Sequence, residues 1–156
     1  PEDISLLAQL VDRSIEESTR ALSITDSQGR TLLHTAACYN RYSIVQFVAR
    51  YTAGAEKGEG GPNSILGNGG ETIDGYALST WINAKDSNGF TALHQAVIAN
   101  SINTVSALLK VPGIRKNSKD KKGWTPLRHA AHRGYLNVVQ FLLREGASPS
   151  RALLEA

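Results

Sequence analysis

Two histidines, His129 and His132, stand three residues apart near the C-terminus. On a helix this spacing brings two imidazole rings to one face, where they could chelate a metal ion. A third ligand is missing, however, and Arg128 and Arg133 flank the pair and would repel a cation. We therefore predict neither a metal site nor a metal cofactor here.

The other candidates for catalysis are His34, His94 and Cys38. No nucleophile or carboxylate recurs beside either histidine, as a catalytic triad would require. Cys38 falls at a surface position of its helix, and no histidine is spaced to activate its thiol, so an inert thiol is favoured. A single cysteine also rules out an intrachain disulfide, and it favours an intracellular location, in the cytoplasm or the nucleus.

A glycine-rich segment, residues 54–80, raises the possibility of a phosphate-binding loop. Gly67-Asn-Gly-Gly70 neither follows a clear strand nor opens a long helix, and no Gly-Lys-Ser/Thr sequence ends it. With no nucleophile, metal site or phosphate loop, we predict that the chain is not an enzyme. We expect no catalytic residues, cofactors or small-molecule substrate.

The composition is that of one ordinary domain. The chain has 156 residues, of which 41% are hydrophobic, enough for one buried core. No apolar run approaches 18 residues and no charged-then-apolar leader opens the chain, so we expect neither a membrane span nor a signal peptide. The start at Pro1 and the absence of methionine suggest part of a longer protein.

These residues are organised around a unit that spans residues 120–147. Asp120 to Gly123 predict a tight turn, Thr125 an N-cap and Pro126 the first residue of a short helix. Gly134 ends that helix, and a second helix follows with a wide apolar face. That face is formed by Val138, Val139, Phe141, Leu142 and Leu143.

The same unit occurs three times. A shift of 34 residues aligns Asp86 with Asp120, and Asp26 begins a further copy, so the period is about 33 residues. The copies carry Thr31-Leu-Leu-His-Thr-Ala, Thr91-Ala-Leu-His-Gln-Ala and Thr125-Pro-Leu-Arg-His-Ala. These resemble the Thr-Pro-Leu-His-x-Ala signature of ankyrin repeats, although the first two lack the proline and Arg128 replaces the histidine.

The resemblance implies an all-α fold: an ankyrin-repeat solenoid of helix-turn-helix units with β-hairpin-type finger loops. It also implies that His34 and His94 are scaffold residues bonded to their repeat's threonine and to backbone. We interpret residues 1–156 as a single domain with the following parts: an N-terminal capping helix or partial repeat (1–25), a repeat (26–53), a glycine-rich insertion loop (54–80), two repeats (81–113 and 114–147), and a C-terminal cap or the start of a further repeat (148–156).

The insertion is inferred from the number of residues between the first two turn aspartates. Asp26 and Asp86 are 60 residues apart, about 27 more than one period allows. A segment this rich in glycine loses much chain entropy on ordering, so we expect a mobile loop. Its returning end should pack on the stack through Tyr76, Leu78, Trp81 and Ile82.

Charge is uneven along the chain. Eight lysines and arginines lie between Lys110 and Arg133, against the single acid Asp120. A solvated face is the simplest explanation. In ankyrin repeats, however, positions around the turn and after the first helix face a concave groove. Carried over to this sequence, the resemblance predicts these partner-binding residues: Arg30, Tyr39, Phe90, Lys119, Lys121, Lys122, Trp124, His132 and Arg133.

This mixture of aromatic and basic side chains suits a non-catalytic protein–protein interaction module within a larger protein. The expected partner is an extended acidic segment with an apolar anchor. Its anchor would bind Tyr39, Phe90 and Trp124, and its charge would be steered by Lys121, Lys122 and Arg133. Trp124 could equally shield its own hairpin.

Three alternatives remain. Nucleic acid could bind the basic C-terminal repeat, but no helix combines basic with base-reading residues. The domain could be a passive scaffold or spacer in a larger enzyme. A methyl-lysine pocket ranks last, because Phe90 and Trp124 stand a repeat apart with no carboxylate between them.

Overall fold

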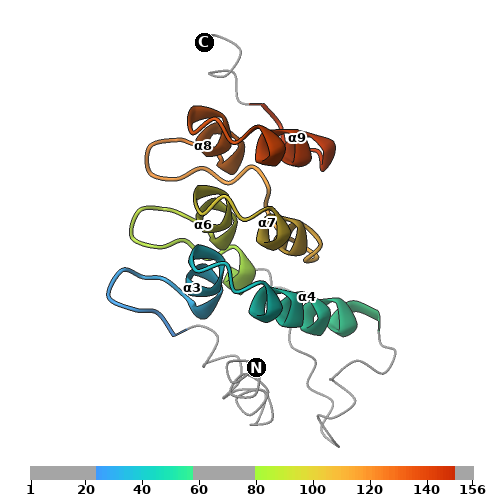
Figure 1. The fold of residues 1–156 in the computed structure, drawn as a ribbon. Helices are drawn as coiled ribbons and strands as arrows, with labels where there is room; N and C mark the ends of the chain where they lie inside the picture. The colour runs from blue at the N-terminus through green and yellow to red at the C-terminus, as the bar shows by residue number, and fades with distance from the viewer. Residues whose placement is uncertain (1–23, 58–79, 150–156) are drawn as a thin grey trace, which may run out of the picture.

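The structure is a computed structural model, and it describes residues 24–57 and 80–149. The expected capping segment, most of the insertion and the last residues therefore lie outside the described part. The described helices form three pairs (Figure 1), which are α3 (Leu32–Cys38) with α4 (Tyr42–Lys57), α6 (Ala92–Ile98) with α7 (Ile102–Leu109), and α8 (Pro126–His132) with α9 (Leu136–Arg144).

The first helix of each pair begins at the threonine that the sequence marks as its N-cap. Thr91 Oγ1 accepts a hydrogen bond from the His94 amide at 3.5 Å, and Thr125 Oγ1 accepts one from the Arg128 amide at 3.3 Å. Pro126 adds a preset φ at the start of α8. The threonine signature therefore starts these helices by satisfying amides that have no partner within the helix.

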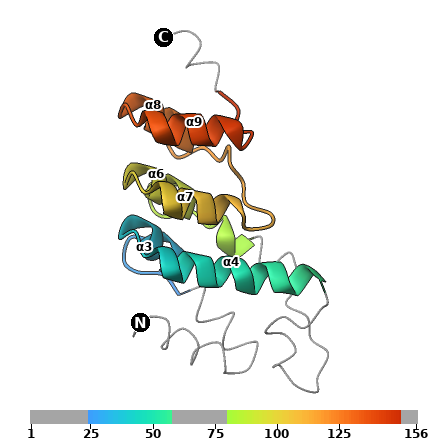
Figure 2. The same cartoon turned by 45° about the vertical axis from the view of Figure 1, so that its right-hand side comes forward.

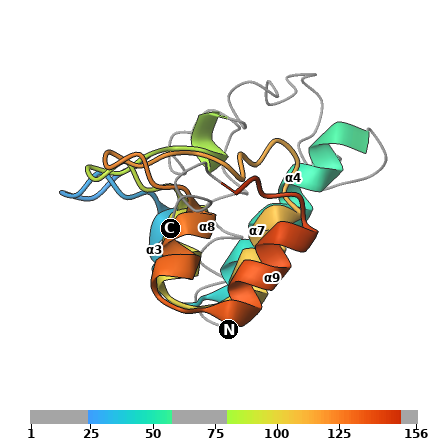
Figure 3. The ribbon, with the colours of Figure 1, turned by 90° about the horizontal axis from the view of Figure 1, so that it is seen from above.

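The pairs stack in register, so the chain forms the all-α solenoid that the repeat pattern predicts. Helices α3, α6 and α8 form one layer, and α4, α7 and α9 form the other (Figures 2 and 3). Buried leucines recur at one position of the inner layer, and buried alanines there let the backbones approach closely. The equivalent core residues are Leu33, Leu93 and Leu127, with Ala36, Ala96 and Ala130 and, from the outer layer, Val48, Leu108 and Leu142.

The described end of the insertion returns to this core. Residues 80–82 form a helical turn, and Trp81 and Ile82 are both buried in the main hydrophobic cluster. The prediction that this end packs on the stack is confirmed for Trp81 and Ile82, while Tyr76 and Leu78 lie outside the described residues. No helix in the described ranges is long and apolar enough to cross a membrane.

Each repeat projects a finger loop closed by backbone hydrogen bonds. In the second finger, the Asp86 amide bonds the Phe90 carbonyl and the Gly89 amide bonds the Asp86 carbonyl, both at 2.9 Å. Neighbouring fingers are also joined, because the Ser87 amide donates to the Gln28 carbonyl and the Lys121 amide donates to the Asn88 carbonyl. The expected hairpin-type fingers are therefore present, and the last two of these backbone hydrogen bonds each join one finger to the next.

The first outer helix is longer than the sequence interpretation assumed. Helix α4 continues to Lys57, past residue 53, where the repeat was expected to end and the insertion to begin. The reason is local, because Ala53, Ala55, Glu56 and Lys57 are strong helix formers and outweigh the cost of Gly54. Gly54 thus lies within a helix.

Three finger glycines offer a graded test of finger stacking. Gly89 and Gly123 have nearly equal φ angles of +78° and +75°, but a Cβ at Gly89 would lie 2.8 Å from the Lys121 amide nitrogen. Nothing lies within 4 Å of a Cβ at Gly123. We expect Gly123→Ala to lower the free energy of unfolding by about 1–2 kcal/mol through φ alone. Gly89→Ala should cost roughly 1–3 kcal/mol more, through overpacking against the next finger.

Urea denaturation followed by circular dichroism measures both values. Gly29→Ala serves as an intermediate control, since its Cβ would lie 3.3 Å from the Ser87 amide nitrogen. Equal losses at Gly89 and Gly123 would contradict the close backbone stacking of the fingers.

Candidate functional site

The site is built on two buried histidines that connect consecutive repeats. His94 Nδ1 lies 3.1 Å from the Thr91 amide, which donates to it, and 2.9 Å from Thr91 Oγ1. Its Nε2 lies 3.1 Å from the carbonyl oxygen of Trp124 in the next repeat. Because Nδ1 accepts from an amide, the proton must reside on Nε2, which donates to that carbonyl.

His34 makes the equivalent link from the first repeat to the second. The Thr31 amide donates to its Nδ1 at 3.2 Å, and Nε2 lies 2.8 Å from the Phe90 carbonyl oxygen. The scaffold role implied for both histidines is thus confirmed. The carbonyls that accept from them belong to Phe90 and Trp124, two of the residues predicted to bind a partner, so the histidines fix the backbone at these two positions.

Both rings are held in the neutral form. Burial lowers the pKa of His94 to about 4, and burial likewise lowers the pKa of His34. A second proton would also place an N–H on Nδ1 facing the threonine amide that now donates to it. Charging either ring would therefore break the bond from the threonine amide at the start of its helix, while the Nε2 proton could still be donated to the next repeat.

The aspartates of the fingers form a second set of hydrogen bonds that recurs in each repeat. Asp120 Oδ1 accepts from the Lys122 and Trp124 amides at 2.8 and 2.9 Å, and Oδ2 accepts from His129 Nε2 at 2.8 Å. Burial alone would raise the pKa of Asp120, but the hydrogen bonds from Trp124, His129 and Lys122 outweigh burial and lower it. The carboxylate thus fixes the conformation of the most basic finger.

The partner of the second carboxylate oxygen changes from repeat to repeat. Gln95 Nε2 binds Asp86 Oδ2 at 3.1 Å, at the position equivalent to His129. In the first repeat that position is Thr35, and Arg30 Nε binds Asp26 Oδ2 at 2.8 Å instead. Arg30, one of the predicted partner-binding residues, is therefore already paired within its own finger.

An aromatic cluster joins the second and third repeats. The Phe90 and Trp124 rings lie 5.5 and 5.1 Å from the His129 ring, and His132 lies 5.0 Å from Trp124. The guanidinium of Arg128 lies 4.4 Å from the centre of the Trp124 ring, a cation–π contact. Phe90 and Trp124, a repeat apart in sequence, are thus brought together by His129, and His132 joins the cluster through Trp124.

The geometry of the cluster bears on two kinds of site, a metal site at His129 and His132 and a methyl-lysine pocket. His129 Nε2 is bonded to Asp120, so this ring does not present that nitrogen to a metal together with His132. A carboxylate, Asp120, does lie beside the aromatic cluster, which the sequence interpretation did not foresee. Both of its oxygens are occupied within the chain, so it is not free to bind a methylated lysine.

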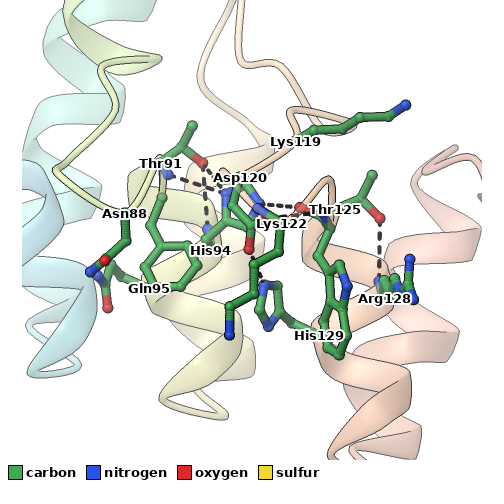
Figure 4. A network of polar contacts seen from close by, with 12 residues as sticks. Asn88, Thr91, His94, Gln95, Lys119, Asp120, Lys122, Thr125, Arg128 and His129 are labelled. Carbon is green, nitrogen blue, oxygen red and sulfur yellow. Dashed lines mark hydrogen bonds and ion pairs between the residues drawn. The ribbon is translucent and has the colours of Figure 1, made fainter.

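The remaining predicted residues differ in their settings. Lys121 and Lys122 are exposed on the third finger, and Figure 4 shows Lys122 extending toward the helices while Lys119 points away from the network. Arg133 is exposed at the end of α8. Tyr39 is 64% exposed in the first repeat. The sequence interpretation missed Arg128 and His129 as parts of the cluster, and the sequence signal for them was only that both lie on the helix that follows Trp124.

The described residues are strongly basic. Residues 24–57 and 80–149 contain fourteen lysines and arginines but only five acidic residues. Three of those acids, Asp26, Asp86 and Asp120, are engaged in the finger turns. The charge available to a partner on this part of the chain is therefore almost entirely positive.

The linking histidines make stability depend on pH. The folded pKa of His94, about 4, lies below the ordinary value of 6.5, so the unfolded chain binds more protons between these values. The contribution of neutral His94 to the free energy of unfolding is complete above about pH 6.5 and is lost as pH falls toward 4. The loss is about 3 kcal/mol at most. Urea denaturation from pH 7 to 4 should show this fall.

The matched variants are His94→Gln and His132→Gln, since His132 is exposed. His94→Gln should reduce the pH dependence between 6.5 and 4, with the part due to His34 remaining, and should reduce it more than His132→Gln does. An equal slope in all three proteins would contradict the linking role.

Comparison with known proteins agrees with this architecture. The chain is similar in fold to a chain in the crystal structure of the yeast ribosomal protein Rps3 in complex with its chaperone Yar1, with a TM-score of 0.70 and 20% sequence identity. The similarity covers 96% of this chain and 88% of that one. No sequence among curated proteins matches significantly.

Family models give the assignment. Residues 28–55 match the model for a single ankyrin repeat. Residues 65–152 match the model for ankyrin repeats in three copies, and this match begins inside the segment interpreted as an insertion. Because that match covers more than half of the sequence, the chain belongs to the ankyrin-repeat family.

Proposed function

We propose that the chain is a non-catalytic protein–protein interaction module that docks an acidic segment of a partner protein in its concave groove. Ankyrin repeats generally serve as non-catalytic interaction modules. The similar chaperone structure is itself a complex between two proteins, which supports a protein as the partner.

One observation carries the proposal: exposed lysines stand beside a preorganised aromatic cluster. Lys121 and Lys122 belong to the finger that Asp120 fixes, and the half-buried Trp124 follows on the same finger. Because the backbone of this finger is already ordered, binding a partner does not have to order the loop, and the remaining entropy cost is that of the lysine side chains. The lysines supply attraction and orientation, and the exposed ring surfaces supply the anchor.

An acidic protein segment fits this surface better than a small molecule does. The finger acids are engaged internally, so the surface offers donors and positive charge but few acceptors. An apolar side chain on the partner would cover Trp124 next to Arg128, whose contact with the ring would then be desolvated and strengthened.

Nucleic acid is the second candidate, and the excess of fourteen basic over five acidic residues in the described ranges favours it. Neutralising several phosphates would make affinity fall steeply with salt. Nucleic-acid recognition usually also needs side chains that read base edges, and the basic residues here lie mainly on loops.

The proposal is tested by a quantitative lysate pull-down with the wild-type chain and with Lys121→Glu/Lys122→Glu, each with and without nuclease. The expected result is a set of proteins that survives nuclease and binds the variant at least about tenfold more weakly, since reversing two steering charges costs over 1 kcal/mol. Circular dichroism establishes that the variant is folded.

Lys110→Glu/Arg115→Glu is the control. It makes the same charge change at exposed residues outside the predicted groove set and should keep the partners. If the nuclease removes all binding, the nucleic-acid alternative is correct. If both variants retain every partner, the basic groove is a solvated face.

A further inference from the structure

The third repeat differs from the other two at the position of the linking histidine. Arg128 stands where His34 and His94 stand in their repeats, three residues after the threonine that begins the helix. Its side chain forms no hydrogen bond and no ion pair with a residue that the structure describes. The guanidinium lies instead 4.4 Å from the centre of the Trp124 ring. Its N–H donors are therefore unpaired within the described ranges.

The arginine weakens the start of its own helix. In the first two repeats the threonine amide donates to Nδ1 of the histidine, but an arginine side chain has no acceptor. The amide of the buried Thr125 accordingly has no hydrogen-bond partner among the described residues. Arg128 also places a positive charge in the first turn of α8, where the helix dipole disfavours it.

A residue that is unfavourable for its own helix in two ways calls for a role other than folding. Sequences usually obey the local rules of helix capping and charge, and departures from them concentrate at functional sites. The departure here falls inside the aromatic cluster and beside the most basic finger. It therefore points to a ligand of the guanidinium.

The setting of Arg128 suits a carboxylate. The planar fork of donors on a guanidinium matches the two oxygens of a carboxylate and can bind both at once. Contact with the Trp124 ring restricts the half-buried arginine before any ligand binds, so less side-chain entropy is lost on binding. Arg128 also stands at the outer edge of the network drawn in Figure 4, away from His94.

The charges around Arg128 also favour an anion. His132 follows it by one helical turn and lies 5.0 Å from Trp124, and Arg133 is exposed at the end of the same helix. The acid nearest in sequence, Asp120, has both oxygens engaged within the chain. A carboxylate from a partner would therefore meet donors and positive charge here, without competition from the carboxylate of the third finger.

We propose that Arg128 determines specificity by binding an aspartate or glutamate carboxylate of the partner, next to the apolar residue that covers Trp124. This inference rests on the proposed protein-binding function and fixes the register of the bound segment, with the carboxylate on the guanidinium and its apolar neighbour on the indole. Because Arg128 is partly buried, salt screens this pair less than it screens the exposed lysines.

Arg128→His is the decisive variant, because it restores the histidine of the repeat signature. The new ring gives the Thr125 amide an acceptor and removes the permanent charge from the first turn of α8. The urea midpoint of the full 156-residue chain at pH 7 should therefore rise, while affinity for the partner falls. A more stable protein that binds less well separates a role in recognition from a role in folding.

The probes are peptides selected from a random library displayed on phage, against the full chain, and their affinities are measured by fluorescence anisotropy. We expect selected peptides to carry an acid beside an apolar residue and to bind Arg128→His at least tenfold more weakly. Arg128→Lys should also bind more weakly than the wild type, because an ammonium lacks the planar fork. The matched control is Arg144→His on α9, an exposed arginine outside the cluster, and it should keep the affinity.

Changes in the peptide identify the group that Arg128 binds. Each acid of a selected peptide is replaced by its amide, Glu→Gln or Asp→Asn. At one position the replacement should weaken binding to the wild type but have little effect on binding to Arg128→His, which is the coupling expected of a direct pair. Additive losses at every position would overturn the pairing.

The remaining outcomes separate this inference from the proposed function. Peptides weakened by Lys121→Glu/Lys122→Glu but not by Arg128→His would overturn the inference and leave the proposed function intact. Peptides insensitive to both variants would overturn both. A lower urea midpoint with unchanged peptide affinity would make Arg128 a structural residue. A labelled single-stranded oligonucleotide that binds the wild type more tightly than the peptides do, and loses affinity in Arg128→His, would assign the site to nucleic acid and overturn the proposal.

Discussion

One hydrogen bond recurs between repeats, and the rest of the structure depends on it. A buried neutral imidazole accepts from the threonine amide that begins its own helix and donates to a carbonyl of the next repeat. It thereby joins a local event, helix capping, to a long-range one, stacking. Because the ring is buried, leaving one of its nitrogens without a hydrogen-bond partner would cost about 1–3 kcal/mol. A stack in which neighbouring repeats were shifted would lose this bond, so the bond fixes the register of the repeats as well as stabilising them.

The same link prepares the surface proposed for binding. The carbonyls held by His34 and His94 belong to Phe90 and Trp124, so each aromatic residue is positioned by the preceding repeat. In the third repeat Arg128 occupies the histidine position, and its guanidinium stacks on Trp124. A scaffold position thus becomes part of the candidate site. The finger aspartates complete the arrangement by fixing the amides of the loops that carry the lysines.

Much of the fold could be predicted from sequence, because turn, cap and apolar residues recur at a constant period. The site could be predicted only in part. The period of the sequence assigns each residue to a position in its repeat, but it does not predict the hydrogen-bond partner of each polar side chain. Asp26 pairs with Arg30, whereas the equivalent Asp120 pairs with His129. The clustering of Phe90, Trp124 and His132 also needs the distance between repeats. The extension of α4 to Lys57 was missed because the whole glycine-rich segment from residue 54 was interpreted as a loop.

The most direct test of this account is the tautomeric state of the two linking histidines. Two-bond proton–nitrogen correlation spectra at pH 7 distinguish a protonated from an unprotonated ring nitrogen. The account predicts that His34 and His94 both carry their proton on Nε2, with Nδ1 unprotonated and accepting from threonine. A proton on Nδ1, or rapid averaging between the two tautomers, would show that neither ring holds the next repeat and would contradict the account.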